Sequence, residues 1–523
     1  MTGTTDRRRT VALLAAGLTL LAGCTVGPSQ RPPLATFGTA PTTVGSAPGS
    51  TTPLGPGGPG QQADPIRWES CPDVDSTDTV TGLRFEVDCG SVVVDRTSPN
   101  SFGDPSVEVA RARAAGVPED APALVVVRGQ PGENGRRRVA AVAAGLSPAV
   151  RDHFAVITVD LVGTGISGPI DCLSGYDTRA LMTLGVDPTD SGAATALAEL
   201  SRSLTFECGD LAGAELSRVN STAAADDLDA LRAALGTQTL AMIGQGFGAT
   251  LGAVYADRYP GRLGAAVLDA PADPLDELDV RAASIAVAAE RALDTFAARC
   301  ADFEGGCPLG NDPRAQVEKA VSVLDDAPGA GPGAGTTNGG SVLLTLLLRL
   351  GDIDGWPELA TALAAATAGD GEPIQEMLTG ALGGIDTPWL GPAIIYACND
   401  SAQRISPEQM TTAVEAIRPQ APLLGPFTIG LVGICASWPA PEAALGAVKA
   451  TGSAPIMVAG AVQDPLAPYD AVQSLAGQLA SATLISWQSG QHGSYPESPC
   501  VSDAVDAYLL TGELPAVGSL CPP

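Results

Sequence analysis

The stretch TLAMIGQGFGATLGAVYADRYP, Thr239 to Pro260, joins an apolar run, a glycine-rich turn and a helical pattern. The run predicts a buried strand at 239–243, and the pattern after the turn predicts a helix to about Tyr259. A strand, a tight turn and a helix in this order are typical of a functional turn at the carboxyl end of a parallel strand. The rest of the chain decides which kind of turn this is.

The N-terminus has the features of an export signal. Three arginines, Arg7 to Arg9, precede thirteen apolar or small residues that end in LAGC at Cys24. This stretch is too short to cross a bilayer, which takes about 20 helical residues. We expect a signal peptide at 1–23, and the ending resembles the lipobox of bacterial lipoproteins, in which Cys24 is lipidated. An ordinary secretory signal with a coincidental cysteine is the alternative.

Residues 24–62 are rich in Pro, Gly, Ser and Thr and carry few bulky apolar side chains. Such a segment cannot bury enough surface to fold, so we expect a linker between membrane and domain. The predicted location is therefore the outer side of the cell membrane, facing the envelope or the exterior. The net charge of −29 argues against nucleic acid as a partner, because a surface this acidic repels phosphate.

Ten further cysteines follow Cys24, and an even number in an exported chain indicates disulfides. The spacing alone does not fix the pairing, and we predict that each cysteine pairs with its sequence neighbour. A zinc site is the competing interpretation, but the short paired C-x-x-C spacings are missing and the chain has only two histidines. We expect no metal. The predicted pairs are Cys71 with Cys89, Cys172 with Cys208, Cys300 with Cys307, Cys398 with Cys435, and Cys500 with Cys521.

Past residue 62, apolar runs alternate with helical patterns, which is typical of an α/β protein with a mostly parallel central sheet. Short apolar runs that precede turn residues predict strands at 123–127 and 155–159. Similar runs return at 454–459 and 482–487. A helix is predicted at 223–235, where apolar residues recur at helical spacing before a glycine.

Between the two groups of strands the chain is helical in character. Apolar residues recur three or four positions apart from Leu278 onward, and no strand-like alternation is expected until the chain nears Ile394. We predict an inserted all-helical lid at 275–385, between core segments at 63–274 and 386–523.

The glycine-rich turn fits two motifs. Gly244, Gly246 and Ala249 match the dinucleotide-binding form G-x-G-x-x-A. The same turn matches the nucleophile elbow G-x-S-x-G of hydrolases, with Gly246 at the serine position. In the dinucleotide fold the turn follows the first strand, whereas here at least two core strands precede it, and an exported protein meets little nucleotide. We favour the elbow and expect no cofactor.

An elbow of this kind is followed, in chain order, by an acid after a late strand and a histidine after the last strand. Both residue types are present. Asp464 follows PIMVAGAVQ, and His492 follows ATLISWQSGQ. Each residue alone is weak evidence for a catalytic site; an Asp before a proline, for example, is usually a turn residue. Together, in this order, they are the candidate site residues.

Most of the mature chain resembles the secreted actinobacterial tripeptidyl-aminopeptidase-like serine peptidases, which are α/β-hydrolases related to prolyl iminopeptidases. The resemblance implies an α/β-hydrolase core with a mostly parallel central sheet and an inserted helical lid. It also implies removal of short peptides from a free N-terminus through an acyl-enzyme, with backbone oxyanion donors at Gln130 and Phe247. The matching segments include IRWESC, RGQPGENG, VDLVGTGISGPIDC, ADRYPGRLGAAVLDAPADP, YACND, QDPLAP and PCVSDAVDAYLLTGELP.

Three positions depart from the family pattern. Gly246 stands where the nucleophilic serine belongs, Gln130 replaces a glycine of the oxyanion loop, and Val162 stands where the family has arginine. A covalent mechanism needs a side-chain oxygen or sulfur on the elbow, and glycine has neither. Glycine also tolerates positive φ, so it relieves the strain of an elbow that no longer catalyses.

Two functions stay open. The first is a binding or scaffold protein of the envelope that lacks ordinary serine-peptidase activity, with a peptide or envelope component as ligand and an envelope protein as partner. The second is a hydrolase of peptides, amides or esters that uses a water activated by His492 and Asp464, or an unidentified nucleophile.

Overall fold

The computed structural model describes residues 64–94, 105–133, 135–330, 336–382, 389–441 and 444–523. The predicted signal peptide, Cys24 and the linker lie outside the described residues. Residues from Gln61 to Pro523 belong to one compact unit. No helix among the described residues is both long enough and apolar enough to cross a bilayer.

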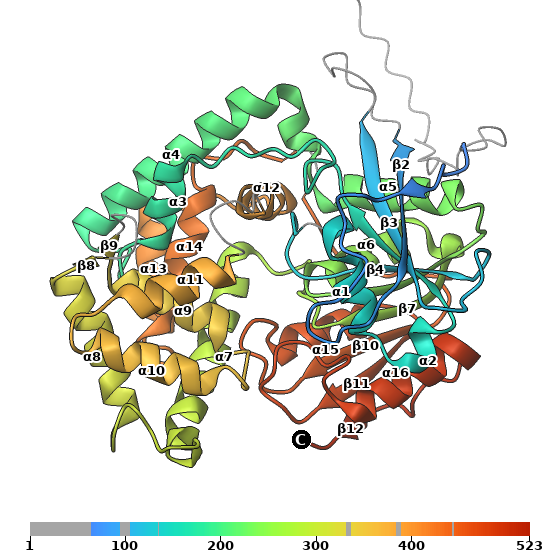
Figure 1. The fold of residues 1–523 in the computed structure, drawn as a ribbon. Coiled ribbons are helices and arrows are strands. Elements are labelled where there is room, and N and C mark those ends of the chain that lie inside the picture. Colours follow the sequence, from blue (N-terminus) through green and yellow to red (C-terminus); the bar gives the residue numbers. More distant parts are fainter. Residues whose placement is uncertain (1–63, 95–104, 134, 331–335, 383–388, 442–443) are drawn as a thin grey trace, which may run out of the picture. The chain divides into compact units, whose positions relative to one another are not determined.

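A ten-stranded sheet forms the core of this unit (Figure 1). It is antiparallel at the edge where the first three strands lie, and parallel from there to the opposite edge. Its spatial order is β1 (Glu69–Ser70), β2 (Glu86–Val93), β3 (Ser106–Arg113), β5 (Ala155–Asp160), β4 (Ala123–Val127), β6 (Leu240–Gln245), β7 (Leu263–Asp269), β10 (Ile456–Ala461), β11 (Ala482–Trp487) and β12 (Ser519–Cys521). From β2 to β11 this is the strand order of the α/β-hydrolase fold, which confirms the predicted fold class.

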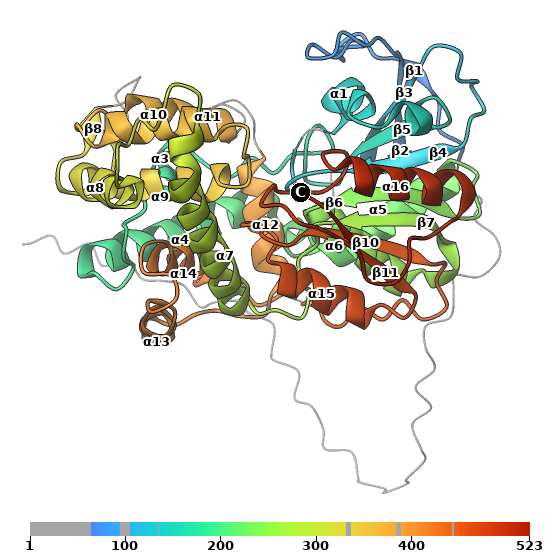
Figure 2. The same ribbon diagram turned by 90° about the horizontal axis from the view of Figure 1, so that it is seen from below.

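Helices cover both faces of the sheet, so the central strands are apolar on both sides. One face packs against α1 (Val139–Ala144), α2 (Pro148–Arg151) and α16 (Pro499–Thr511). The other packs against α5 (Ser221–Ala234), α6 (Phe247–Arg258) and α15 (Tyr469–Gln478). Figure 2 shows α1 and α16 on one side of the sheet and α6 and α15 on the other. Because the strands from β5 onward run parallel, their carboxyl ends lie along one edge of the sheet.

The helical part is larger than the predicted lid at 275–385. It contains the expected α7 (Leu278–Arg299), but helices continue beyond residue 385 as far as a short 3-10 turn at Gly433–Cys435. The other helices after α7 are α8 (Pro313–Asp326), α9 (Gly339–Arg349), α10 (Trp356–Ala366), α11 (Glu372–Ala381), α12 (Leu390–Asp400), α13 (Pro407–Ile417) and α14 (Leu424–Val432).

Two earlier helices also join this part. These are α3 (Gly175–Met182) and α4 (Ser191–Ala212), and they pack against α9 and the Gly433–Cys435 turn respectively. The expectation that strand-like structure resumes near Ile394 is wrong, because Ile394 is buried inside α12. A short apolar run fits either a buried helix or a buried strand, and here the packing against neighbouring helices decides.

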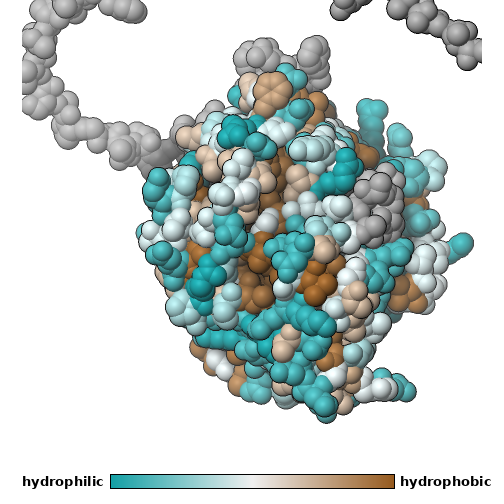
Figure 3. Space-filling view, turned by 90° about the vertical axis from the view of Figure 1, so that its left-hand side faces the viewer, coloured by the Kyte–Doolittle hydropathy of each residue, from teal (hydrophilic) through white to brown (hydrophobic). Residues whose placement is uncertain are grey.

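The face of the helical part drawn in Figure 3 shows hydrophobic side chains near its middle, bordered by hydrophilic ones. The helices α3 and α4 expose single apolar side chains, Tyr176, Phe206 and Leu211. Scattered apolar residues of this kind are normal on protein surfaces.

All five predicted disulfides are present, each between sequence neighbours: Cys71–Cys89, Cys172–Cys208, Cys300–Cys307, Cys398–Cys435 and Cys500–Cys521. Cys172–Cys208 fastens the loop after β5 to α4, and Cys398–Cys435 fastens α12 to the end of α14. These two bridges therefore tie the helical part together at points where the chain leaves and re-enters the core.

The bridges differ in the length of chain that they close, which predicts different contributions to stability. Cys398 and Cys435 are 37 positions apart, and Cys300 and Cys307 are 7 apart. In the chain-entropy account, replacing the first pair with alanine lowers the free energy of unfolding by about 1–2 kcal/mol more than replacing the second. Urea unfolding of the two double variants measures this. A greater loss from the short loop would show that native-state packing, not loop entropy, governs these bridges.

Candidate functional site at the elbow after the central strand

Gly246 forms a sharp reversal between β6 and α6. Its backbone has φ 58° and ψ −119°, a conformation that strains any residue with a side chain. Its N–H donates to the carbonyl of Asp269 at 2.9 Å, and its carbonyl accepts from the N–H of Ala249 at 3.1 Å. The turn is thereby fixed to the neighbouring strand on one side and to the first turn of α6 on the other.

The two flanking glycines are needed for close approach. A Cβ on Gly244 would lie 2.2 Å from the carbonyl oxygen of Gly248, and a Cβ on Gly248 would lie 2.1 Å from that of Val127. A Cβ on Gly246 meets only the Gly129 carbonyl oxygen, at 3.4 Å. Small residues at positions 244 and 248 with open space at 246 are the pattern of a nucleophile elbow. The turn also follows a central strand, not the first one, which argues against the dinucleotide interpretation.

The structure brings Asp464 and His492 together. Asp464 follows β10 and His492 follows β11, two adjacent parallel strands, so both loops emerge at the same edge of the sheet. His492 Nδ1 lies 3.0 Å from Oδ1 and 2.9 Å from Oδ2 of Asp464. Asp464 is buried, and its carboxylate accepts backbone N–H groups from Leu466, Ala467 and Gly493. With Nδ1 held in this way, Nε2 is the ring nitrogen left for a ligand or a proton transfer.

Two opposing effects set the basicity of His492. Burial lowers the pKa of the imidazole, and the nearby carboxylate of Asp464 raises it by charge attraction and hydrogen bonding; the net result is a raised pKa. Because the folded-state pKa exceeds the unfolded one, the pairing stabilises the fold fully below about pH 6.5 and is lost as pH rises through the folded-state pKa.

The histidine loop is tied to the helical part. The N–H of His492 donates to the carbonyl of Gly351 at 2.8 Å, and the N–H of Ile353 donates to Oε1 of Gln491 at 3.0 Å. Gly351 and Ile353 belong to the connection between α9 and α10. The ring of Phe247 packs edge-on against Tyr396 of α12, with 5.1 Å between centroids. Core and helical part therefore meet directly at the site.

Asp269 has a supporting role that the sequence did not reveal. Its Oδ2 accepts the N–H groups of Ser494 and Tyr495, at 2.8 and 2.9 Å, and so holds the histidine loop against the end of β7. Burial raises the pKa of this carboxyl. Its Oδ1 has no hydrogen-bond partner among the described residues. The available signal was an acid at the end of an apolar strand.

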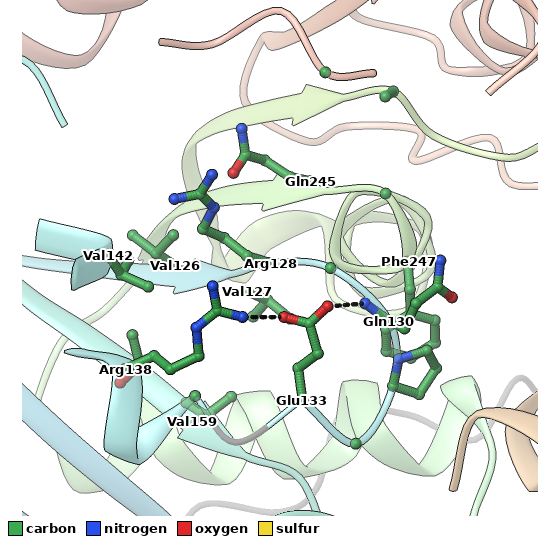
Figure 4. A pocket seen from close by; sticks show the side chains of 18 of the residues that line it. Val126, Val127, Arg128, Gln130, Glu133, Arg138, Val142, Val159, Gln245 and Phe247 are labelled. Atoms are coloured by element: carbon green, nitrogen blue, oxygen red, sulfur yellow. Dashed lines mark hydrogen bonds and ion pairs between the residues drawn. The ribbon is translucent and has the colours of Figure 1, made fainter. Parts of the chain in front are cut away.

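The predicted oxyanion loop is occupied by a side chain of the protein itself. The N–H of Gln130 donates to Oε1 of Glu133 at 3.3 Å, and Oε2 of Glu133 pairs with Arg138 at 2.7 Å (Figure 4). Phe247, the second predicted donor, is the first residue of α6, where the helix dipole favours negative charge. Glu133 was missed from the sequence, because the loop must close before its carboxylate can reach the Gln130 N–H.

Position 246 and His492 line one cavity of about 330 Å³. The cavity runs from the elbow past the ends of β4 and β5 to α1, and Gln130, Glu133 and Phe247 also line it. Volumes of this size are found in small-molecule sites. Four of the predicted site residues thus line a single hollow, and the fifth, Asp464, contacts His492 without lining it.

The other residues considered from the sequence do not add a nucleophile. Ser167 is buried, with its hydroxyl donating to the carbonyl of Asp160 at 2.5 Å and accepting from the N–H of Glu108 at 2.8 Å. Val162 is partly buried against the core. The ten cysteines of the described residues are all in disulfides.

Comparisons with known proteins agree with the fold. Residues 421–521 match the family described as TAP-like protein. Serine protease Hip1 of Mycobacterium tuberculosis is 28% identical over 485 residues, covering 87% of this chain and 91% of that protein. Tripeptidyl aminopeptidase of Streptomyces lividans is 25% identical over 473 residues, covering 88% and 87%. Carboxylesterase B of Mycobacterium tuberculosis is 28% identical over 541 residues, covering 99% of both. The chain is a homologue of TAP-like α/β hydrolases.

The balance of effects on His492 predicts a measurable titration. In a His153→Gln background one imidazole remains, and NMR should give it a pKa above about 6.5. Adding Asp464→Asn removes the main charge that raises the pKa and leaves only the smaller effect of Asp269 against burial, so the pKa should fall. A titration that Asp464→Asn leaves unchanged would mean that the two groups are not paired in solution.

Proposed function

We propose that this homologue of TAP-like hydrolases is an envelope-anchored binding protein that does not cleave peptides through an acyl-serine intermediate. One observation carries the proposal. The elbow beside His492 and Asp464 has the backbone geometry that presents a nucleophile, but the residue at its tip is Gly246. The cavity above it is accessible to a ligand while the reactive side chain is missing.

The missing side chain matters more than any other difference in the site. Removing the nucleophile of a serine-peptidase triad typically lowers kcat by a factor on the order of 10⁶. What remains, roughly 10³ to 10⁴ over the reaction in water, comes from binding and oxyanion stabilisation. Ser167 cannot take over, because it lies in another loop and both its hydroxyl hydrogen bonds are made to the backbone.

Glu133 argues in the same direction. An acyl-transfer intermediate carries a negative oxygen that the Gln130 and Phe247 N–H groups would stabilise. In this chain a carboxylate already accepts from the Gln130 N–H, so it competes for the donor and repels a developing oxyanion. Restoring serine at position 246 would therefore leave the oxyanion site impaired.

The cellular setting is part of the proposal. Cys24 would carry the lipid, with residues 24–62 as spacer, and the folded unit would stand on the outer side of the membrane. The partners that fit this setting are a peptide or another envelope component in the cavity and an envelope protein on the surface. The acidity of the chain supports neither nucleic acid nor an anionic lipid surface as a partner.

A hydrolytic function is the second candidate, and the intact pair of His492 and Asp464 favours it. A water in the space beside Gly246 could be deprotonated by Nε2 while Asp464 orients the ring and stabilises the imidazolium. This mechanism forms no acyl-enzyme. It predicts slow turnover of a peptide, amide or ester.

The proposal predicts how a serine-directed probe will react. The chain should not be labelled by a fluorophosphonate, and Gly246→Ser should be labelled slowly. The double variant Gly246→Ser, Glu133→Ala should react about tenfold faster or more, because one oxyanion donor is freed. Gel fluorescence measures the rates, with Glu133→Ala alone as the unlabelled control. Stoichiometric labelling of the unmodified chain would reveal a nucleophile elsewhere and end the proposal.

The two candidate functions separate on the role of His492. The binding function predicts that hydrolysis of a tripeptide anilide by the chain is no faster than by His492→Ala. The water mechanism predicts that turnover disappears in His492→Ala and persists in His153→Ala, which removes the other histidine. Release of the aniline chromophore measures both. His492-dependent turnover would establish the hydrolase and contradict the binding function.

A further inference from the structure

The cavity beside the elbow contains a guanidinium, that of Arg128, which forms no ion pair with any residue that the structure describes. Arg128 follows β4, lines the cavity and remains partly accessible to solvent. It makes no ion pair or hydrogen bond with any described residue. Its Nη1 lies near Gly145 at the end of α1, where a Cβ on that glycine would be 3.4 Å away. The guanidinium therefore lies beside the end of α1.

A second guanidinium stands nearby. Figure 4 shows Arg128 and Arg138 on the same side of the Glu133 carboxylate, and only Arg138 is joined to it. Burial lowers the pKa of Arg128, and the charge of Arg138 lowers it further, against the opposite effect of Glu133, Asp269 and Glu497. In a chain with twice as many acids as bases, an unpaired arginine inside a cavity is unusual. It indicates that a negative group from outside completes the site.

The charged groups around Arg128 determine how many negative charges a ligand bound there can carry. Arg138 and Glu133 neutralise each other as an ion pair. Glu497 is exposed, and burial raises the pKa of Asp269. A single negative charge therefore balances Arg128, while a dianion such as phosphate would face the carboxylates of Glu133 and Glu497 as well.

The other side chains that line the cavity determine the chemical character of the rest of the ligand. Polar and apolar side chains share the lining of the cavity, and the apolar ones are Val126, Ala141, Val142, Val159, Leu161 and Phe247. The planar fork of a guanidinium matches a carboxylate with two parallel hydrogen bonds. We propose that the cavity binds a small monocarboxylate with an apolar body, the carboxylate on Arg128 and the body between α1 and the elbow.

This inference rests on the proposed binding function and names the ligand class for the same cavity. The His492 side chain, at one end of the cavity, is free to contact a polar group of the ligand through Nε2. Glu133 stays on the Gln130 N–H, so the ligand carboxylate does not occupy the oxyanion position. The ligand is consequently bound beside the elbow without being in position for attack.

Calorimetric titration of the full chain tests the ligand class. The probes are acetate, isovalerate and N-acetyl-leucine, with N-acetyl-leucinamide as the neutral match of the last and inorganic phosphate as the dianion. We expect N-acetyl-leucine to bind at least tenfold tighter than its amide and than phosphate. Arg128→Gln should weaken it about tenfold or more, which corresponds to about 1.4 kcal/mol. Arg202→Gln removes the same charge from the surface of α4 and should have no effect.

A second variant guards against misfolding as the cause. Ala141 is exposed on α1 at the cavity wall. Ala141→Phe leaves Arg128 in place, so it should weaken the binding of every carboxylate while the circular dichroism spectrum stays unchanged. Three results would each overturn the inference. The acid and the amide could bind equally, or Arg128 could be needed for binding phosphate alone. No carboxylate could bind at 10 mM, which would limit the binding free energy to about 3 kcal/mol at most. None of these results changes the fluorophosphonate outcome, which tests the proposed function separately.

Discussion

The backbone reversal at Gly246 is the constraint on which the rest of the site depends. It joins the central strand to the helix beneath the sheet through a turn with positive φ, pinned to Asp269 and flanked by two glycines that have no room for a side chain. The neighbouring loops and helices converge on the residue at the tip of this turn. The loops after β4, β7 and β11 converge there, and the helical part contacts the same point through Gly351 and Tyr396.

The site has two parts. His492 is paired with Asp464, and Asp269 supports the histidine loop, through charge-assisted hydrogen bonds. In the loop after β4, Glu133 accepts from the Gln130 N–H, and Arg128 lines the cavity without a partner among the described residues. A fixed imidazole, a guanidinium and a glycine at the tip of the elbow are the features on which the proposed binding function rests.

Much of this could be predicted from the sequence, for identifiable reasons. The strands at 123–127 and 482–487 are found with those bounds, because short apolar runs between turn residues leave little choice. His492 and Asp464 were placed by chain order, since parallel strands deliver their following loops to one edge. The extent of the helical part was missed, because the apolar run around Ile394 reads equally as helix or strand. Glu133 and Arg128 were missed because their importance lies in whether each has a partner, and only the folded loop decides that.

The central claim is that position 246 keeps the strained geometry of an elbow and that glycine makes it strain-free. The stability of Gly246→Ser in urea tests this most directly, because a Cβ there meets nothing closer than 3.4 Å and any loss must come from the backbone. The account predicts a free energy of unfolding lower by about 1–3 kcal/mol. A Gly246→Ser chain as stable as the original would contradict it, since the reversal would then not require positive φ at this residue.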